Sequence, residues 1–476
     1  MASTLGQLEH ERGFFKPQTF VDRSAELAYV NRQLDRIRVG APPEDAIYEV
    51  LGERGMGKTT LLYQMRDRAS YMPTALIDFT GRDGQSLYTS EQPEAMKDLV
   101  INMGRQIEEG QSLGLDGFRL TRIEDLPESE VIGRFHEYIR DLLNYQRRVP
   151  ILILLDSAQD CPQPLFNSLQ QSVLMPLIET EKVQVVVGSR TNLAWSPFDV
   201  RKQVDTTTLG LFDEAQSRAQ LEGPDYDIQL AKKADLVHAI TGGWPGGNRF
   251  LYERLSTVEF DEVSDQDLEG RLRQELVENY IFRPEDPRPY VNTSFSQALL
   301  AVSPYRDLTF PRLKVILQET SPDIFASWKD SQFLELEQEM IRNGYIDVRV
   351  FIGMNPITGA VLSSYYSQID PEKYAHAIES AKNYYKELIS NSSPIYLADY
   401  LYYQVLADRR YWRDTEYDLM SRVGETVNET VEKLPPVEGF PGFYIDQIKS
   451  RLENYQIWRR LFSDEEMEIL FGLLNR

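Results

Sequence analysis

One segment of the chain carries residues whose types and spacing suit the binding of a polyphosphate. Residues 52–59 read Gly-Glu-Arg-Gly-Met-Gly-Lys-Thr, a complete G-x-x-x-x-G-K-[ST] sequence. Glycines at this spacing let backbone N–H groups turn toward a phosphate chain, which a following helix N-terminus also attracts. In such a loop Lys58 meets the β- and γ-phosphates, and the hydroxyl of Thr59 is a ligand of Mg²⁺. The segment therefore predicts binding of ATP or ADP together with Mg²⁺.

The residues on both sides of this segment have the pattern that such a loop requires. A short apolar run, 46–51, ends at the first glycine, and a helical pattern follows Thr60. We therefore expect a strand, a glycine loop and a helix, in that order. The predicted nucleotide-binding residues of the loop are Gly52, Glu53, Arg54, Gly55, Met56, Gly57, Lys58, Thr59 and Thr60.

Two later apolar runs end in residues that could complete the site. One run of aliphatic residues ends in Asp156, which we expect to hold Mg²⁺ together with Thr59. The next run, 183–187, leads to Arg190, which could reach the γ-phosphate or an attacking water. Lys58, Asp156 and Arg190 are accordingly the candidate catalytic residues of a P-loop NTPase.

The pattern along the chain predicts a doubly wound α/β core followed by helical parts. Apolar runs of strand length alternate with helical patterns up to about residue 210, which favours a parallel sheet buried on both faces. The expected strands are 46–51, 74–79, 149–155, 183–187 and, more weakly, 206–211. A helical region follows and ends at a proline-rich joint, Arg283 to Pro289.

The block behind this joint predicts a winged helix. Three helical stretches are followed by two alternating runs, 345–351 and 360–366, which we interpret as the strands of a β-hairpin. The expected division is a P-loop NTPase core (1–210), a helical lid (211–283), a winged-helix-like domain (284–368) and an α-helical tail (369–476).

Composition narrows the class of protein and its partners. The net charge is −23, from 51 basic and 74 acidic residues, and a field of that sign repels nucleic acid and anionic membranes. No apolar run approaches the roughly 20 residues that a membrane span needs. The single cysteine, Cys161, excludes an internal disulfide framework. We therefore expect a cytoplasmic protein with no membrane partner, for which nucleic acid is an unlikely partner.

Taken in order, these features resemble the signal-transduction ATPases with numerous domains (STAND), a branch of the AAA+-like P-loop ATPases. The resemblance covers about residues 15–360. Beside the phosphate loop it is carried by Phe20-Val21-Asp22-Arg23, Asp156-Ser157-Ala158-Gln159-Asp160, Gly188-Ser189-Arg190-Thr191 and Thr241-Gly242-Gly243-Trp244-Pro245. It implies that Val21 and Arg23 line the adenine and that Pro245 packs near the base. Arg249, which opens the lid helix, is a candidate second phosphate sensor.

The chain also departs from this family at positions that bear on catalysis. Ser157 stands where the family has a second acid that orients the hydrolytic water. Glu53 and Asp160 are nearby acids, but neither lies at the matching position. Asp22 replaces a glycine of the adenine motif, and residues 290–366 contain no histidine to meet the β-phosphate. The resemblance therefore implies slow ATP hydrolysis, or binding without turnover.

Three functional hypotheses follow. The first is a STAND-type switch, in which ADP holds the lid and winged helix on the core and ATP favours association with further copies or with an effector protein. The second is a DNA-binding AAA+ ATPase resembling the origin-recognition initiators. Its best candidate recognition helix, 327–345, contains Glu335, Glu337 and Glu339, which would repel phosphates and so favour the first hypothesis. The third is a scaffold that a bound nucleotide merely stabilises.

Overall fold

The chain divides into two compact units. The computed structural model describes residues 20–21, 23–80, 94–109, 123–145, 149–221, 233–256, 265–282, 293–305, 308–347, 353–390, 396–411 and 424–425. One unit comprises Met1–Leu276 with Arg283–Pro287, and the other comprises Val277–Phe282 with Arg288–Arg476. The predicted boundaries near 210 and 368 remain predictions. None of the described helices combines the length and the apolar character that a membrane span requires.

A five-stranded parallel sheet forms the centre of the first unit. Its strands are β1 (Ile47–Leu51), β2 (Thr74–Asp78), β3 (Ile151–Asp156), β4 (Val183–Ser189) and β5 (Val204–Thr208). They lie in the order β2-β3-β4-β1-β5, and every pairing is parallel. The carboxyl ends of β1, β3 and β4 therefore lie at the same end of the sheet. This confirms the predicted parallel α/β core.

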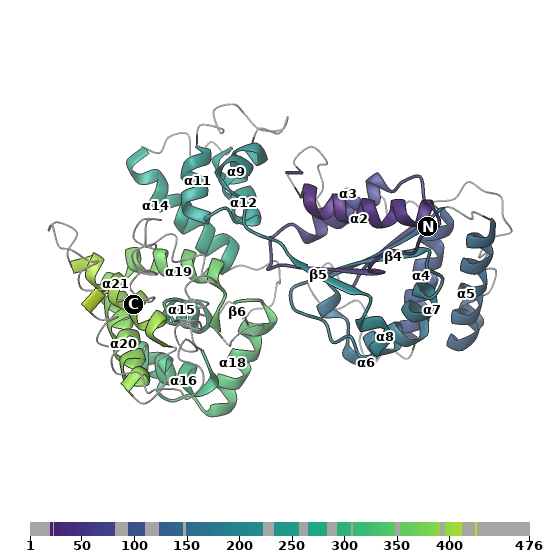
Figure 1. Cartoon of the computed structure of the whole chain (residues 1–476). Helices are drawn as coiled ribbons and strands as arrows, with labels where there is room; N and C mark the ends of the chain where they lie inside the picture. Colours follow the sequence, from purple (N-terminus) through teal and green to yellow (C-terminus); the bar gives the residue numbers. More distant parts are fainter. Residues whose placement is uncertain are drawn as a thin grey trace. The chain divides into compact units, whose positions relative to one another are not determined.

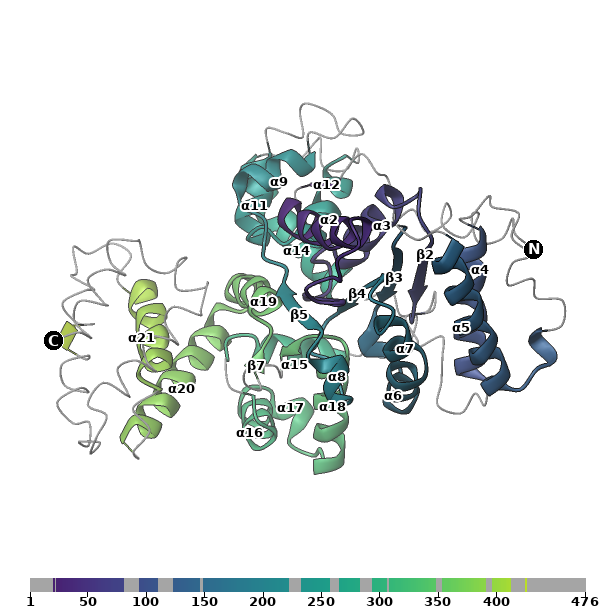
Figure 2. The ribbon, with the colours of Figure 1, turned by 45° about the vertical axis from the view of Figure 1, so that its right-hand side comes forward.

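Helices cover both faces of this sheet (Figure 1). One face carries α2 (Ser24–Arg38) and α3 (Lys58–Arg68), and the other is covered by the helices between β2 and β4. These are α4 (Ala95–Glu109), α5 (Glu128–Tyr145), α6 (Gln163–Leu169), a π-helical segment (Gln170–Leu174) and α7 (Met175–Ile178). The turned view shows α4 and α5 beside β2 and β3 (Figure 2). A short helix, α8 (Phe198–Arg201), precedes β5.

Side chains that alternate along each strand form an apolar layer on each face of the sheet. In β3, Ile151, Ile153 and Leu155 belong to one continuous apolar cluster with side chains from α4 to α7. Leu152 points the other way and lines a small hollow with Leu27 of α2. Successive side chains of a strand face opposite sides, so an uninterrupted apolar run is what a strand buried on both faces requires.

The fifth strand lies two to three residues earlier than the apolar pattern predicts. The expected range is 206–211, whereas β5 spans Val204–Thr208. It is an edge strand whose residues are half-buried or exposed, so threonines are tolerated there and the apolar residues behind it do not mark its position.

Four described helices follow β5 within the same unit. They are α9 (Glu214–Leu221), α11 (Ala234–Thr241), α12 (Pro245–Leu255) and α14 (Asp265–Glu275). A buried polar cluster joins the first three. Asn248 of α12 donates to Ser217 Oγ at 3.1 Å and to Gln220 Oε1 at 3.2 Å, both in α9, and Ser217 Oγ also lies 2.9 Å from Nδ1 of His238 in α11. The helical character predicted for this region is observed in its described residues.

The described part of the second unit is mostly helical. Its described elements are a π-helical segment that begins at Leu276 (Leu276–Ile281), α15 (Thr293–Val302), α16 (Phe310–Thr320), α17 (Pro322–Phe325), α18 (Asp330–Arg342), β6 (Ile346–Asp347), β7 (Gly353–Met354), α19 (Pro356–Ile369), α20 (Pro371–Ser390) and α21 (Leu397–Tyr411). Helices α20 and α21 pack side by side (Figure 2). Between them the rings of Tyr385 and Tyr403 stack with centroids 5.3 Å apart.

The predicted second strand of the hairpin, 360–366, is wrong, because these residues lie inside α19. Asn355 caps this helix: its side-chain oxygen accepts hydrogen bonds from the N–H groups of Ile357 and Thr358. Pro356 then occupies the first helical position, which suits its fixed φ and missing N–H. Among the described residues the hairpin consists instead of β6 and β7, which pair antiparallel. The winged-helix assignment of 284–368 remains an interpretation.

Candidate nucleotide-binding site

The loop between β1 and α3 has the backbone shape that a phosphate-binding loop needs. Gly55 and Gly57 have φ values of 77° and 89°, in the left-handed region that favours glycine. Gly57 is also the residue before α3, so the loop ends directly at a helix N-terminus. The Nζ of Lys58 donates to the carbonyls of Gly52 at 2.6 Å and Glu53 at 3.1 Å, which places the ammonium against the start of the loop.

The structure brings the two predicted magnesium ligands together. The hydroxyl of Thr59 lies beside the carboxylate of Asp156, at the end of β3, close enough to lower the pKa of that carboxyl. Asp156 is 2% exposed, and this burial raises the pKa of its carboxyl, although the Thr59 hydroxyl and the positive charge of Lys58 oppose the rise. A buried carboxylate beside a hydroxyl at the end of a phosphate loop is a donor set that suits Mg²⁺.

A glycine on β4 leaves the space in which these groups meet. A Cβ atom added at Gly188 would stand 3.1 Å from Asp156 Oδ1, 3.1 Å from Leu62 Cδ1 and 3.7 Å from the Cβ of Lys58. Strand β4 lies between β1, which leads into the phosphate loop, and β3, which ends in the aspartate. The absence of a side chain at this position keeps the site open.

Arg190, the candidate phosphate sensor, is held at the edge of the site by Asp160. Its guanidinium donates to both carboxylate oxygens of Asp160, at 2.9 and 3.1 Å, and both side chains are about one fifth exposed. The backbone N–H of Arg190 donates to Gln159 Oε1 at 2.9 Å. Asp160 also accepts from Thr80 at 3.1 Å, beyond the end of β2. The sequence points to Arg190 but gives no sign of this pairing across 30 residues.

Ser157 occupies an unusual backbone conformation directly after the buried aspartate. Its φ is 54°, in the left-handed region, and its N–H donates to Asp156 Oδ1 at 2.9 Å. A short 3₁₀ helix, Ala158–Asp160, follows. The position at which a second acid would stand in the resembled family therefore carries a hydroxyl in this structure.

Of the remaining predicted site residues, Arg23 contacts the phosphate loop. Arg23 donates to the carbonyls of Met56 at 3.2 Å and Gly210 at 2.8 Å, and its guanidinium lies 5.0 Å from the ring of Phe212. Val21 is half-buried. Pro245 is buried at the first position of α12.

Arg249 forms an exposed ion pair with Glu253, one turn along α12, at 2.9 Å. This contact lies within one helix. Its role as a second phosphate sensor stays a prediction.

Two residues near the loop are missed by the sequence reasoning. Glu49, on β1, is only 3% exposed, and its carboxylate accepts from Leu193 N at 2.9 Å and from Thr206 Oγ1 at 3.2 Å. Burial raises the pKa of Glu49. The indole Nε1 of Trp244 donates to the carbonyl of Arg54 at 2.8 Å. A lone acid within a predicted buried strand is the only signal that the sequence offers for Glu49.

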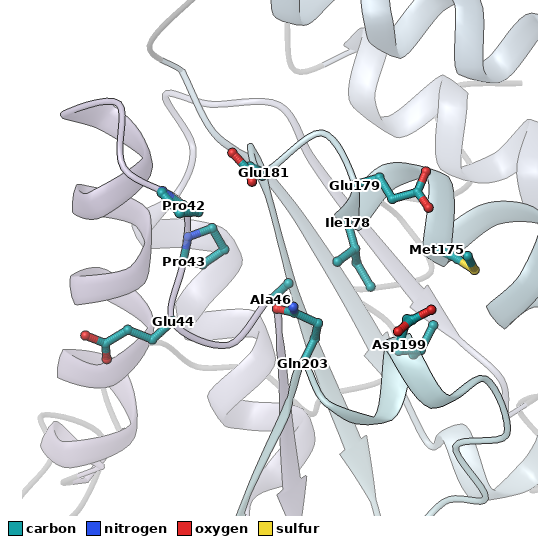
Figure 3. Close-up of a pocket in the computed structure, with 11 residues that line it drawn as sticks. Pro42, Pro43, Glu44, Ala46, Met175, Ile178, Glu179, Glu181, Asp199 and Gln203 are labelled. Atoms are coloured by element: carbon teal, nitrogen blue, oxygen red, sulfur yellow. The ribbon is translucent and has the colours of Figure 1, made fainter.

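A separate pocket of about 440 Å³ lies at the opposite end of the sheet (Figure 3). Ala46 and Gln203, which precede β1 and β5, help to line it. Its acidic lining residues are Glu44, Glu179, Glu181 and Asp199. Carboxylates repel phosphate groups, so this pocket does not suit a nucleotide.

The sheet, the glycine loop and the adjoining lysine, threonine and aspartate define the fold of the first unit as an α/β P-loop core. No protein-family model matches the chain, and no curated protein sequence matches it. Solved structures that the comparison finds similar to this chain include Cdc6p of Pyrobaculum aerophilum, at 13% identity and a TM-score of 0.38, covering 73% of this chain and 96% of that one.

Two further structures are similar to the same extent. Orc1 of Aeropyrum pernix in complex with DNA shows 16% identity and a TM-score of 0.36, covering 74% of this chain and 93% of its own. The RuvB Holliday junction branch migration motor of Thermotoga maritima shows 10% identity and a TM-score of 0.35, covering 71% and 93%.

Proposed function

We propose that this chain binds ATP and ADP with Mg²⁺ at the β1–α3 loop and hydrolyses ATP slowly. The observation that carries the proposal is the contact between Thr59, behind the glycine loop, and the buried carboxylate of Asp156. In this assignment Lys58 meets the β- and γ-phosphates, and Thr59 and Asp156 hold the metal ion directly or through its water. When bound, Mg²⁺ neutralises charge that develops on the transferred phosphoryl group.

Slow turnover is expected because no acid follows Asp156 directly. Ser157 has a neutral side chain, which is a weak base for a water molecule. Asp160, the next acid along the chain, already accepts hydrogen bonds from Arg190, Gln159 and Thr80. Its carboxylate is therefore occupied in holding the sensor arginine rather than a nucleophile. A positioned base contributes roughly 10²- to 10⁴-fold to such a reaction.

We further propose that the nucleotide acts as a switch, as in the STAND ATPases that the chain resembles. Support comes from two hydrogen bonds between the start of α12 and the phosphate loop. Trp244 Nε1 donates to Arg54 O, and the N–H of Gly246 donates to Gly55 O. A change at the phosphates can thus reach the lid helices without an intermediary. Switching then needs only that ATP and ADP differ in affinity for two arrangements of the chain.

The second hypothesis, a DNA-binding ATPase, makes a different prediction about partners. Helix α18 would be its recognition helix, and on this helix Glu335 is exposed while Glu337 and Glu339 are half-exposed. Acidic groups at these positions oppose contact with a phosphate backbone, so any DNA contact is expected elsewhere on the chain. Labelled duplex DNA titrated at low and high salt tests this: salt-sensitive submicromolar binding would favour the DNA-binding function over the switch.

The switch itself is tested by the mass of the protein in solution with Mg²⁺-ADP and with Mg²⁺-ATP. Light scattering coupled to size-exclusion chromatography should show that ATP, and not ADP, promotes association. Asp156→Asn is the matched variant, because it keeps the size of the side chain and removes its charge, and it should remain in the ADP-like state. An identical mass under both nucleotides, with both bound, would contradict the switch and favour the scaffold hypothesis.

A further inference from the structure

Three consecutive carbonyl groups of the phosphate loop accept hydrogen bonds from outside the loop. Trp244 Nε1 donates to Arg54 O at 2.8 Å, and the N–H of Gly246 donates to Gly55 O at 2.8 Å. The guanidinium of Arg23 donates to Met56 O at 3.2 Å. Two of these donors precede or begin α12, and the third immediately precedes α2.

These bonds fix the direction of the backbone N–H groups on the other side of the loop. A trans peptide is planar, so the carbonyl of one residue and the N–H of the next point in opposite directions. Holding the carbonyls of Arg54 and Met56 therefore turns the N–H groups of Gly55 and Gly57 away from the donors. The N–H of Met56 donates within the loop, to Glu53 O at 3.2 Å. Ordered N–H groups of this kind form the concave array that binds phosphate.

The glycines on both sides of Trp244 allow its indole to pack against the phosphate loop. Gly242 and Gly243 both adopt left-handed conformations, with φ values of 66° and 81°. A Cβ atom at Gly243 would lie 1.8 Å from Phe212 O, and one at Gly247 would lie 2.8 Å from Trp244 Cε3. The tryptophan itself is 5% exposed. Glycines on both sides thus admit a large buried ring whose N–H reaches the loop.

We infer that Trp244 is a positioning residue for the phosphate loop, which it orients from the outer side through Arg54. The inference rests on the proposed nucleotide-binding function. Because Trp244 and the phosphates favour the same peptide orientation, docking of the lid and binding of a polyphosphate strengthen each other. Trp244 then acts on the phosphate chain and not on the base, in contrast to the role near the adenine that the resemblance implies for its neighbour Pro245.

The test compares Trp244→Phe with the wild-type protein in binding of Mg²⁺-ADP and of magnesium tripolyphosphate, which has no base. The phenylalanine keeps an aromatic ring and removes the N–H. Loss of one neutral hydrogen bond should weaken both ligands by a similar factor, about two- to tenfold. Trp328→Phe, in the second unit, is the matched control and should leave both affinities unchanged. Thermal unfolding of each variant, measured without ligand, separates a loss of binding from a loss of folding.

The outcomes distinguish the inference from the function on which it rests. Weaker binding of ADP with unchanged binding of tripolyphosphate would mean that Trp244 acts on the base, and would overturn the inference. Unchanged binding of both ligands would overturn it as well. If the wild-type protein binds neither ligand, the proposed function fails instead. Should Trp244→Phe not fold, Arg23→Met removes the hydrogen bond to Met56 O, another of the three loop carbonyls. Unchanged tripolyphosphate affinity in that variant would contradict the inference.

Discussion

Glu49 provides a prediction whose size and pH dependence can be worked out from the structure. Its buried carboxylate joins β1 to the segment after β4 and to β5, through Leu193 N and Thr206 Oγ1. A neutral hydrogen bond contributes about 0.5–1.5 kcal/mol, and a buried N–H left without its acceptor, here that of Leu193, costs about 1–3 kcal/mol. The Thr206 bond counts for less because that residue is exposed. We expect Glu49→Ala to lower the free energy of unfolding by about 2–4 kcal/mol.

Glu49→Gln tests the electrostatic part of this reasoning. Burial raises the pKa of Glu49, so the folded protein favours the protonated carboxyl. The stabilising contribution is then fully present below the ordinary pKa of glutamate and is lost as the pH rises through the raised value. Glutamine resembles the protonated form and can keep both hydrogen bonds, its amide N–H donating to the Thr206 hydroxyl. Relative to the wild-type protein, this variant should therefore gain stability as the pH rises above the ordinary pKa of glutamate.

Urea unfolding at several pH values, followed by tryptophan emission and by circular dichroism, measures these differences. Glu335→Gln, which changes an exposed glutamate of α18, is the matched control and should show a difference near zero at every pH. A deficit of Glu49→Gln that grows as the pH rises would refute the reasoning, because it would mean that the fold requires the charged carboxylate.

Three further predictions concern the site itself. Gly188→Ala places a methyl group 3.1 Å from Asp156 Oδ1, so it should lower the free energy of unfolding by about 1–3 kcal/mol and weaken nucleotide binding. The control is Gly133→Ala in α5, where the space around the added methyl group is open, and urea unfolding should show it to be neutral or stabilising. Asp156→Asn should abolish the Mg²⁺ dependence of ATP affinity in calorimetry and leave the fold intact; an unchanged dependence would remove this residue from the metal site. Arg190→Met breaks the ion pair with Asp160 and should reduce the affinity for ATP more than that for ADP, with at most about 1 kcal/mol lost in stability.

The sequence predicts the core well because the core depends on local patterns. Strands buried on both faces must be continuously apolar, and β3 and β4 are found where such runs occur. The phosphate loop is predictable for a similar reason, since its glycines, lysine and threonine all lie within one short segment of the sequence. Edge strand β5 is displaced because an edge position tolerates polar residues, so composition marks its bounds poorly.

The errors come from residues whose meaning depends on tertiary contacts or on capping. Alternation in 360–366 suggests a strand, yet Asn355 and Pro356 begin a helix, and a cap with proline at the first position outweighs a weak period-two pattern. Glu49 gives no local sign of its two donors, which come from positions 193 and 206. Likewise, the resemblance directs attention to Pro245, while the hydrogen bond to the loop comes from Trp244.

The most direct test of the account is isothermal titration of wild-type protein and Lys58→Ala with ATP and ADP in the presence of Mg²⁺. Lys58 is buried against the first carbonyls of the loop, so its removal takes away the cation nearest the predicted phosphates. We predict saturable binding of both nucleotides by the wild-type protein and none by a folded Lys58→Ala variant. Absence of binding by the wild-type protein, or equal binding by the variant, would contradict the central claim.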